Sequence, residues 1–193
     1  MPKIVIPVHF AGQSCHMSKI KSLSLKFGFS IIEDASHAIG SRYLDNFVGG
    51  CQYSDITVFS FHPVKIITTA EGGAAVTNNN KLARLMYQLR THGITKDKNY
   101  FTEKNDGPWY YEQNTIGYNY RLTNLQAAVG VAQLERSDHL VSQKRWMAEI
   151  YAERLRDSRL FSLPGEYGDV VNSYWLYTIY LKNKLSDKLY LSN

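Results

Sequence analysis

The sequence holds little cysteine or proline and no long apolar run. Of its 193 residues, two are cysteine and five are proline. Cys15 and Cys51 are too few for a zinc cluster or a disulfide framework, and we interpret both as small buried side chains. Their scarcity favours a reducing, cytoplasmic setting. No segment approaches the about 20 consecutive apolar residues of a membrane helix, so we expect no contact with a membrane.

Charge of one sign is not concentrated anywhere along the chain. Lysine and arginine outnumber aspartate and glutamate by 22 to 17, a net charge of +5, but the basic residues are scattered. A scattered excess of this size does not by itself indicate nucleic-acid binding, and we expect none. The composition, 44% hydrophobic and 20% charged, excludes a disordered chain, a collagen and a coiled coil.

Several common site signatures are also missing. The sequence has no Gly-x-Gly-x-x-Gly after a strand, no phosphate loop ending in Gly-Lys-Ser/Thr, no His-Glu-x-x-His and no Gly-x-Ser-x-Gly. His37, His62 and His92 lack the spacing of metal ligands, so we expect no metal site. The chemistry must therefore come from residues outside these motifs.

The first part of the chain predicts an α/β fold. Apolar, β-branched runs at 3–8 and 30–33 are typical of buried strands, and apolar residues at helical spacing occupy 17–27 between them. Strand, helix, strand is the unit of a parallel sheet. Further strands are predicted at 55–60 and 72–77.

The second part predicts helices on both sides of a long loop. Residues 82–89 have apolar side chains at i, i+3, i+4 and i+7, whereas 94–113 is polar and aromatic without a period. A capping box, Thr123 with Gln126, begins a helix that ends near Leu134. Apolar residues then favour a helix over 140–155, and 174–181 is typical of a strand.

Two chemically useful residues follow neighbouring predicted strands. Asp34 comes directly after the strand at 30–33, and Lys65 lies five residues beyond Ser60, the end of another strand. Ligands of open α/β sheets bind at the carboxyl ends of the strands. A carboxylate and an amine at this edge would suit a cofactor that needs a covalent amine and a fixed negative charge.

Three segments, in this order, carry a resemblance to a known family. They are 33–40 (EDASHAIG), 60–73 (SFHPVKIITTAEGG) and 117–128 (GYNYRLTNLQAA). Together they resemble the hallmark motifs of the DegT/StrS-like sugar-nucleotide aminotransferases, which are fold-type-I pyridoxal-phosphate enzymes. Residues 5–13 (VIPVHFAGQ) are similar to the branch that aminates a UDP-linked 4-keto-6-deoxy-N-acetyl-hexosamine on the way to pseudaminic acid.

The resemblance implies a role for each matched residue. Lys65 would hold pyridoxal 5′-phosphate covalently and move a proton once substrate displaces it, and Asp34 would pair with the pyridine nitrogen. His37 would contact the phenolic oxygen or the face of the ring, although a histidine that only begins a helix remains an alternative. Ser60 would bind the cofactor phosphate, and Asn119 would reach that phosphate from a partner subunit, with Arg121 nearby as a weaker candidate.

The implied protein is a cytoplasmic homodimer with a shared site. It would transfer an amino group from a donor such as glutamate to a keto-sugar nucleotide. Trp109-Tyr110-Tyr111 would either line the sugar or uracil pocket or only pack the loop. Two alternatives remain: a related sugar dehydratase, against which Lys65 argues because those relatives carry histidine there, and a degenerate remnant that is stable only beside a partner.

The implied fold is the large domain of a fold-type-I transferase, a mainly parallel sheet between helices. We expect residues 1–160 to form part of this domain and 161–193 to begin an incomplete, small C-terminal subdomain. The family's phosphate-binding turn and ring-stacking aromatic have no match upstream, so the chain is expected to be a fragment. Ala70 replaces an expected glycine, a mild change if its φ is negative.

Overall fold

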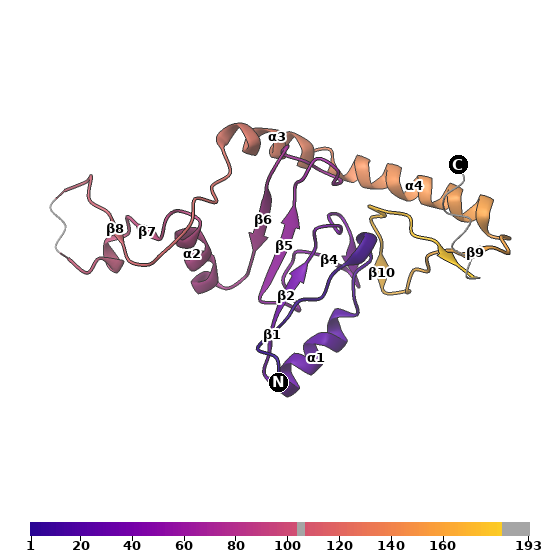
Figure 1. The fold of residues 1–193 in the computed structure, drawn as a ribbon, viewed down its shortest axis with the longest axis horizontal. Coiled ribbons are helices and arrows are strands. Elements are labelled where there is room, and N and C mark those ends of the chain that lie inside the picture. Colours follow the sequence, from indigo (N-terminus) through magenta and orange to yellow (C-terminus); the bar gives the residue numbers. More distant parts are fainter. Residues whose placement is uncertain (104–106, 183–193) are drawn as a thin grey trace, which may run out of the picture.

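The structure, a computed structural model, describes residues 1–103 and 107–182 and is built around a four-stranded sheet (Figure 1). The strand order is β1-β2-β5-β6. The first three strands run parallel and the last is antiparallel to β5. Their bounds are Ile4–Val5, Ser30–Asp34, Ile56–Ser60 and Gly73–Val76. The expected α/β fold with a mainly parallel sheet is confirmed.

Four α-helices occupy the regions where the sequence predicts them. Gly28, with φ of 74°, ends α1, and the side chain of Asn79 caps α2 by accepting from two backbone N–H groups. The predicted capping box of Thr123 and Gln126 is present at the start of α3. The bounds are α1 Met17–Phe27, α2 Asn80–Leu89, α3 Asn124–Leu134 and α4 Ser137–Leu155.

A second, smaller sheet joins the C-terminal segment to the first half of the chain. β10 (Val170–Val171) pairs with β3 (Arg42–Tyr43), which also pairs with β4 (Asn46–Phe47). Tyr43 and Val170 share a buried cluster with Met17, Phe29 and Ile31. The predicted division after residue 160 stays a prediction, and residues 183–193 of the expected subdomain lie outside the described part.

The predicted strand at 174–181 is wrong for most of its length. Only β11 (Tyr180–Leu181) is extended and paired, with β9 (Phe161–Ser162). The residues before it form hydrogen bonds to the loop after β2, and Tyr174 adopts a left-handed φ of 50°. Tertiary contacts therefore override the β propensity of this aromatic run.

Residues 90–103 and 107–122 form an arm that lies beyond β6, on the side of the sheet opposite to β10 (Figure 1). The arm contains a two-stranded hairpin of β7 (Ile94–Thr95) and β8 (Glu112–Gln113) and one turn of 3-10 helix, η2 (Lys98–Tyr100). A similar short turn, η1 (Phe10–Gly12), follows β1. The described residues of the long loop predicted at 94–113 thus have little regular structure.

The two cysteines differ in burial. Cys51 is buried as expected, but Cys15 is only half-buried because it lines a surface cavity. Within residues 1–103 and 107–182, no helix is long and apolar enough to cross a membrane. The same residues contain no cluster of three or more histidine, cysteine or acidic side chains that could hold a metal.

Candidate active site

Asp34 and Lys65 meet at one edge of the sheet because they follow adjacent parallel strands. Asp34 is the last residue of β2, and Lys65 lies in the turn after β5. The register places Asp34 opposite Val58, two residues before that strand ends at Ser60. The positive charge of Lys65 acts on both Asp34 and His37. The structure therefore brings the two principal predicted residues together.

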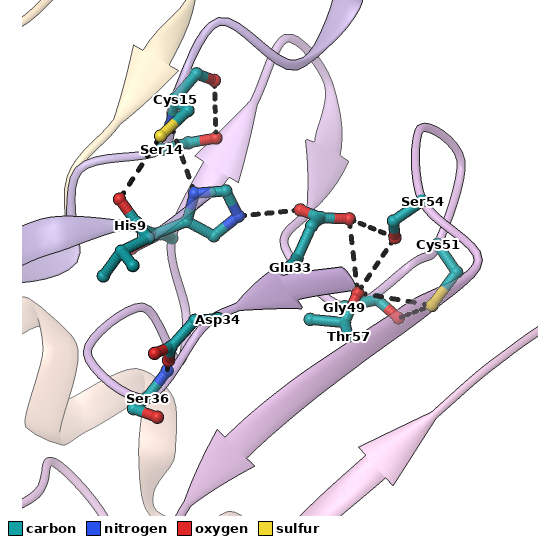
Figure 2. Close-up of polar contacts among 12 residues, drawn as sticks. His9, Ser14, Cys15, Glu33, Asp34, Ser36, Gly49, Cys51, Ser54 and Thr57 are labelled. Carbon is teal, nitrogen blue, oxygen red and sulfur yellow. Dashed lines mark hydrogen bonds and ion pairs between the residues drawn. The ribbon is translucent and has the colours of Figure 1, made fainter. Parts of the chain in front are cut away.

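The backbone of Asp34 is held from both sides. Its N–H donates to the carbonyl of Pro7 at 2.9 Å, and its carbonyl accepts from the N–H of His9 at 3.0 Å. On the other side, the next residue donates its N–H to the carbonyl of Val58 at 2.8 Å. The carboxylate accepts from the N–H of Ser36 at 3.0 Å (Figure 2). This clamping fixes the direction of the carboxylate.

The carboxylate of Asp34 is stabilised in its charged form. Partial burial alone would raise its pKa, but hydrogen bonds from Ser36 and the charges of His37 and Lys65 outweigh burial and lower the pKa. A permanently ionised carboxylate beside an amine is the pair that a protonated heterocyclic nitrogen and a covalent carbonyl group require.

His37 lies in the turn after β2, not at the start of a helix. Its Nδ1 accepts from the N–H of Ala11 at 3.4 Å, which ties it to the loop after β1. Partial burial and the positive charge of Lys65 lower its pKa, and the charge of Asp34 only partly opposes them. A neutral imidazole can accept or donate a hydrogen bond at the site edge.

Trp175 is a site residue that the sequence analysis missed. Its indole stacks on His37 with ring centroids 3.8 Å apart, and Nζ of Lys65 lies over the indole at 4.3 Å from its centroid. Nothing in the local sequence distinguishes it, because Tyr174 and its neighbours are typical of a strand. Only the fold brings a residue 110 positions after Lys65 to that lysine.

Ser60 completes the strand end beside the turn that carries Lys65. Its hydroxyl accepts from the N–H of His62 at 3.4 Å. Ser60, Ser36, His37 and Lys65 all border one small cavity of about 10 Å³. The hydroxyl is thus on the same edge as the amine and the imidazole, as the sequence predicts.

Asn119 and Arg121 lie in a different place. Asn119 forms an isolated bridge with Thr91 beyond the end of α2, and its side-chain oxygen accepts from Nε of Arg121 at 2.9 Å. Both side chains are exposed on the arm. Among the interactions of the described residues, none joins either of them to Asp34 or Lys65 within this chain.

Arg121 borders a large cavity of about 910 Å³ formed by α2 and the arm. The cavity is rich in basic and aromatic side chains. Cation–π pairs join Arg84 to Tyr100 at 4.0 Å and Arg90 to Tyr87 at 4.7 Å. Other residues that line it are Lys96, Trp109 and Tyr111. Two of the three aromatics at 109–111 therefore face a cavity.

A buried polar network lies on the other face of β2 from Asp34 (Figure 2). Glu33 contacts Nε2 of His9 at 2.7 Å and accepts from Ser54 and Thr57. His9 and Thr57 are fully buried. Burial alone would raise the pKa of Glu33, but the hydrogen bonds from His9, Ser54 and Thr57 lower it.

The groups around His9 favour opposite protonation states of its ring. The N–H of Cys15 faces Nδ1 at 3.2 Å, which favours the neutral ring, and burial also lowers the pKa. The Cys15 thiol and the Glu33 carboxylate favour the charged ring and raise the pKa of His9 to about 9. The shorter, wholly buried contact with Glu33 decides, because Coulomb attraction grows in a poorly solvated site.

Ala70, in the lysine segment, does not meet the condition, a negative φ, under which its replacement of glycine would be mild. Its φ is 66°, in the left-handed region that favours glycine. The N–H of Ala70 donates to the hydroxyl of Thr68 at 3.0 Å, and Thr69 is buried. The turn after Lys65 thus imposes a glycine-like backbone on an alanine.

Comparison with known families explains this geometry. Residues 2–192 match the DegT/DnrJ/EryC1/StrS aminotransferase family. The chain belongs to that family. Its three matching segments include the strand end of Asp34, the turn of Lys65 and the arm segment that precedes α3. The predicted resemblance is therefore confirmed.

Relatives of this aminotransferase family show the extent of the match. GDP-perosamine synthase of Escherichia coli O157:H7 is 36% identical over 97% of this chain and 50% of its own length. A Campylobacter jejuni UDP-4-amino-4,6-dideoxy-N-acetyl-beta-L-altrosamine transaminase is 39% identical over 80% of this chain and 38% of its own. The chain thus spans about half the length of the curated relatives it matches.

Solved structures agree with the sequence match. PseC of Helicobacter pylori, an aminotransferase of pseudoaminic acid biosynthesis, superimposes with a TM-score of 0.83 and 34% identity, over 93% of this chain and 45% of PseC. A sugar aminotransferase, Spr1654 of Streptococcus pneumoniae, has been solved in a PLP form and superimposes with a TM-score of 0.76 and 28% identity, over 93% of this chain and 48% of its own. The fold is that of the fold-type-I aminotransferases.

The cofactor indicated by this family is pyridoxal phosphate, and the site residues suit it. An amine can bond to its carbonyl carbon, and a carboxylate with a lowered pKa can face its ring nitrogen. Imidazole and hydroxyl groups at the same edge can bind its remaining oxygen atoms. The donor set at the ends of β2 and β5 thus matches the chemistry of the coenzyme.

Proposed function

We propose that the protein transfers an amino group from an amino acid to a keto-sugar nucleotide, with pyridoxal phosphate as coenzyme. The observation that carries this proposal is the meeting of Lys65 and Asp34 at adjacent strand ends of a sugar-aminotransferase fold. When bound, the coenzyme supplies a carbonyl carbon that carries the amino group and a ring that accepts electrons.

Each predicted residue at this edge would have a separate role. The Lys65 amine would bond to the coenzyme and, once displaced, accept a proton and return it at the neighbouring carbon. Asp34 would hold the ring nitrogen in its protonated form, which its own low pKa permits. His37 would bind the phenolic oxygen, and the hydroxyl of Ser60 would donate to the phosphate.

The proposed acceptor is a UDP-linked 4-keto-6-deoxy-N-acetyl-hexosamine. Support comes from the names of the relatives, which include a transaminase of a UDP-linked amino sugar and a GDP-perosamine synthase. The cavity of the arm adds independent support, since its arginines suit a diphosphate and its aromatic residues suit a base. Glutamate is the proposed amino donor.

A homodimer with a shared site is the proposed active unit. Asn119 and Arg121 stand away from Lys65 in their own chain, as they would if they served the site of a partner. The arm also exposes large apolar side chains, among them Ile116 at 86% and Tyr120 at 72%. We place this dimer in the cytoplasm, because both cysteines are free thiols.

The test is a half-reaction with the purified chain. After incubation with pyridoxal phosphate and then glutamate, the chain should release the corresponding keto acid and lose the visible absorbance of the bound aldehyde. Lys65→Met should abolish both signals. Asp34→Asn should retain coenzyme but transfer the amino group at least about a hundredfold more slowly, because it keeps the shape and loses the charge.

A mixing experiment tests the shared site and the two alternatives. Lys65→Met and Asn119→Ala chains, each inactive, should regain activity when mixed if one intact site forms between them. Failure of every chain to bind coenzyme would favour the remnant without independent activity. Loss of water from the sugar without gain of an amino group would favour the dehydratase.

A further inference from the structure

Trp175 makes three separate contacts with the groups proposed to act on the coenzyme. It stacks on the imidazole of His37 at 3.8 Å and 24° between planes. Its ring holds Nζ of Lys65 at 4.3 Å. Its Nε1–H donates to the carbonyl of Val64 at 2.8 Å, the peptide group that links Val64 to the lysine. One indole therefore contacts the amine, its backbone and the neighbouring imidazole.

The position of Trp175 is set by buried hydrogen bonds, not by a flexible tail. Ser173, fully buried, donates its hydroxyl to the carbonyl of His37 at 3.3 Å and its N–H to Ser41 at 3.2 Å. The side-chain oxygen of buried Asn172 accepts from the N–H of Tyr174 at 2.8 Å, which supports the left-handed φ at that residue. Backbone strain that surrounding hydrogen bonds hold in place is common at functional sites.

Gly12 shows how closely this segment fits. A Cβ at Gly12 would lie 2.6 Å from the hydroxyl of Ser173 and 2.8 Å from the side-chain oxygen of Asn172. The loop after β1, which also binds Asp34 and His37, thus approaches the Trp175 segment to within backbone contact. The site edge and the Trp175 segment are therefore closely packed against each other.

We propose that Trp175 is a positioning residue that seats the Lys65 amine beside His37 whenever the amine is not bonded to the coenzyme. This inference rests on the proposed function of Lys65. The amine stands on a four-carbon chain with considerable rotamer freedom. After displacement it must stay near the reacting carbon to move a proton, and the face of an indole attracts an ammonium group. The hydrogen bond from Trp175 to the carbonyl of Val64 holds the backbone of Lys65 in place beside the indole.

The inference can be tested without coenzyme or substrate. Trace labelling of the cofactor-free chain with acetic anhydride, read by peptide mass spectrometry, gives the reactivity of Lys65 relative to the exposed Lys19 and Lys81. The amine must leave the indole before it can attack the reagent. Trp175→Leu should therefore raise the relative labelling of Lys65 about two- to tenfold, from the usual strength of a cation–π contact.

Matched variants separate seating from general structure. Trp175→Phe, which keeps a weaker π face, should give an intermediate increase. Trp146→Leu, at an exposed position of α4, should give none. Unchanged Lys65 labelling in Trp175→Leu, with the unfolding midpoint preserved, would overturn the inference.

A second measurement covers the case in which Trp175→Leu fails to fold. In a Trp109→Phe, Trp146→Phe background, Trp175 is the remaining tryptophan, and Lys65→Met should change its emission spectrum while Lys19→Met does not. Identical emission spectra for the background chain and its Lys65→Met and Lys19→Met variants would contradict the contact between Lys65 and Trp175. Neither measurement involves amino-group transfer, so a chain that fails the half-reaction can still pass here, and the reverse also holds.

Discussion

The site edge and the arm hold their predicted residues in opposite ways. The segment that carries Asp34 and His37 forms hydrogen bonds with residues far apart in the sequence, namely Pro7, Val58 and Ser173. Asn119 and Arg121 contact mainly each other and the end of α2. The edge is therefore built by contacts within one chain, whereas the arm presents its residues outward.

This contrast can be tested on two carboxylates, Glu33 in the sheet and Glu112 on the arm, each of which accepts several hydrogen bonds. Glu33→Ala should lower the free energy of unfolding by about 3–5 kcal/mol, because it leaves His9 buried without its partner. Glu112, partly exposed in β8 on the arm, accepts from the N–H groups of Thr102 and Glu103 and from the hydroxyl of Tyr110. Glu112→Ala should shift the midpoint of chemical denaturation much less, because solvent reaches its backbone partners and can replace the lost hydrogen bonds. Equal shifts in both variants would refute the contrast.

The pH dependence of unfolding tests the pairing of His9 with Glu33 without removing either residue. The folded state raises the pKa of His9 from 6.5 to about 9, so its pairing with Glu33 is fully stabilising below pH 6.5. That contribution should disappear as the pH rises through about 9. Denaturation between these values should show a falling midpoint, and His9→Gln should flatten the curve. A flat curve in the unsubstituted chain would be evidence against a charged His9.

Substitution of two glycines with positive φ, one at the site edge and one on an open surface, tests how tightly the edge is packed. Gly12→Ala should cost about 2–4 kcal/mol, because a left-handed backbone and a clash with Ser173 act together. At Gly28, which ends α1 with φ of 74°, nothing lies within 4 Å of an added Cβ. Gly28→Ala should cost only about 1 kcal/mol. Thermal unfolding of both chains measures the difference, and a larger loss at Gly28 would disprove the tight fit.

The smallest expected effect is a gain. Ala70→Gly should stabilise the chain by about 1 kcal/mol, because glycine adopts the φ of 66° without strain. Chemical denaturation would detect this gain as a higher midpoint. A loss of stability would mean that unfolded-state entropy outweighs the strain at this turn.

Local patterns predicted the elements that depend on local signals. The helices at 17–27, 82–89 and 123–134 follow from apolar spacing and from capping residues such as Thr123. Strand order placed Asp34 and Lys65 at one edge, because the ends of neighbouring parallel strands coincide. These features need no knowledge of distant contacts.

Tertiary contacts decided what the sequence could not reveal. Trp175 lies in an aromatic run that is typical of a strand, and contacts between distant residues, such as that of Ser173 with Ser41, 132 positions away, fix its place. The pairing of His9 with Glu33 also joins distant segments. The left-handed φ of Ala70 depends on the turn around it, since alanine itself avoids that region.

The most direct test is to find which amine carries the coenzyme. The chain would be incubated with pyridoxal phosphate, reduced with borohydride and digested, and the labelled lysine identified by peptide mass spectrometry. The account predicts the label on Lys65, with a lower yield in Asp34→Ala. Labelling spread over surface lysines such as Lys19 and Lys81, with Lys65 unmodified, would contradict it.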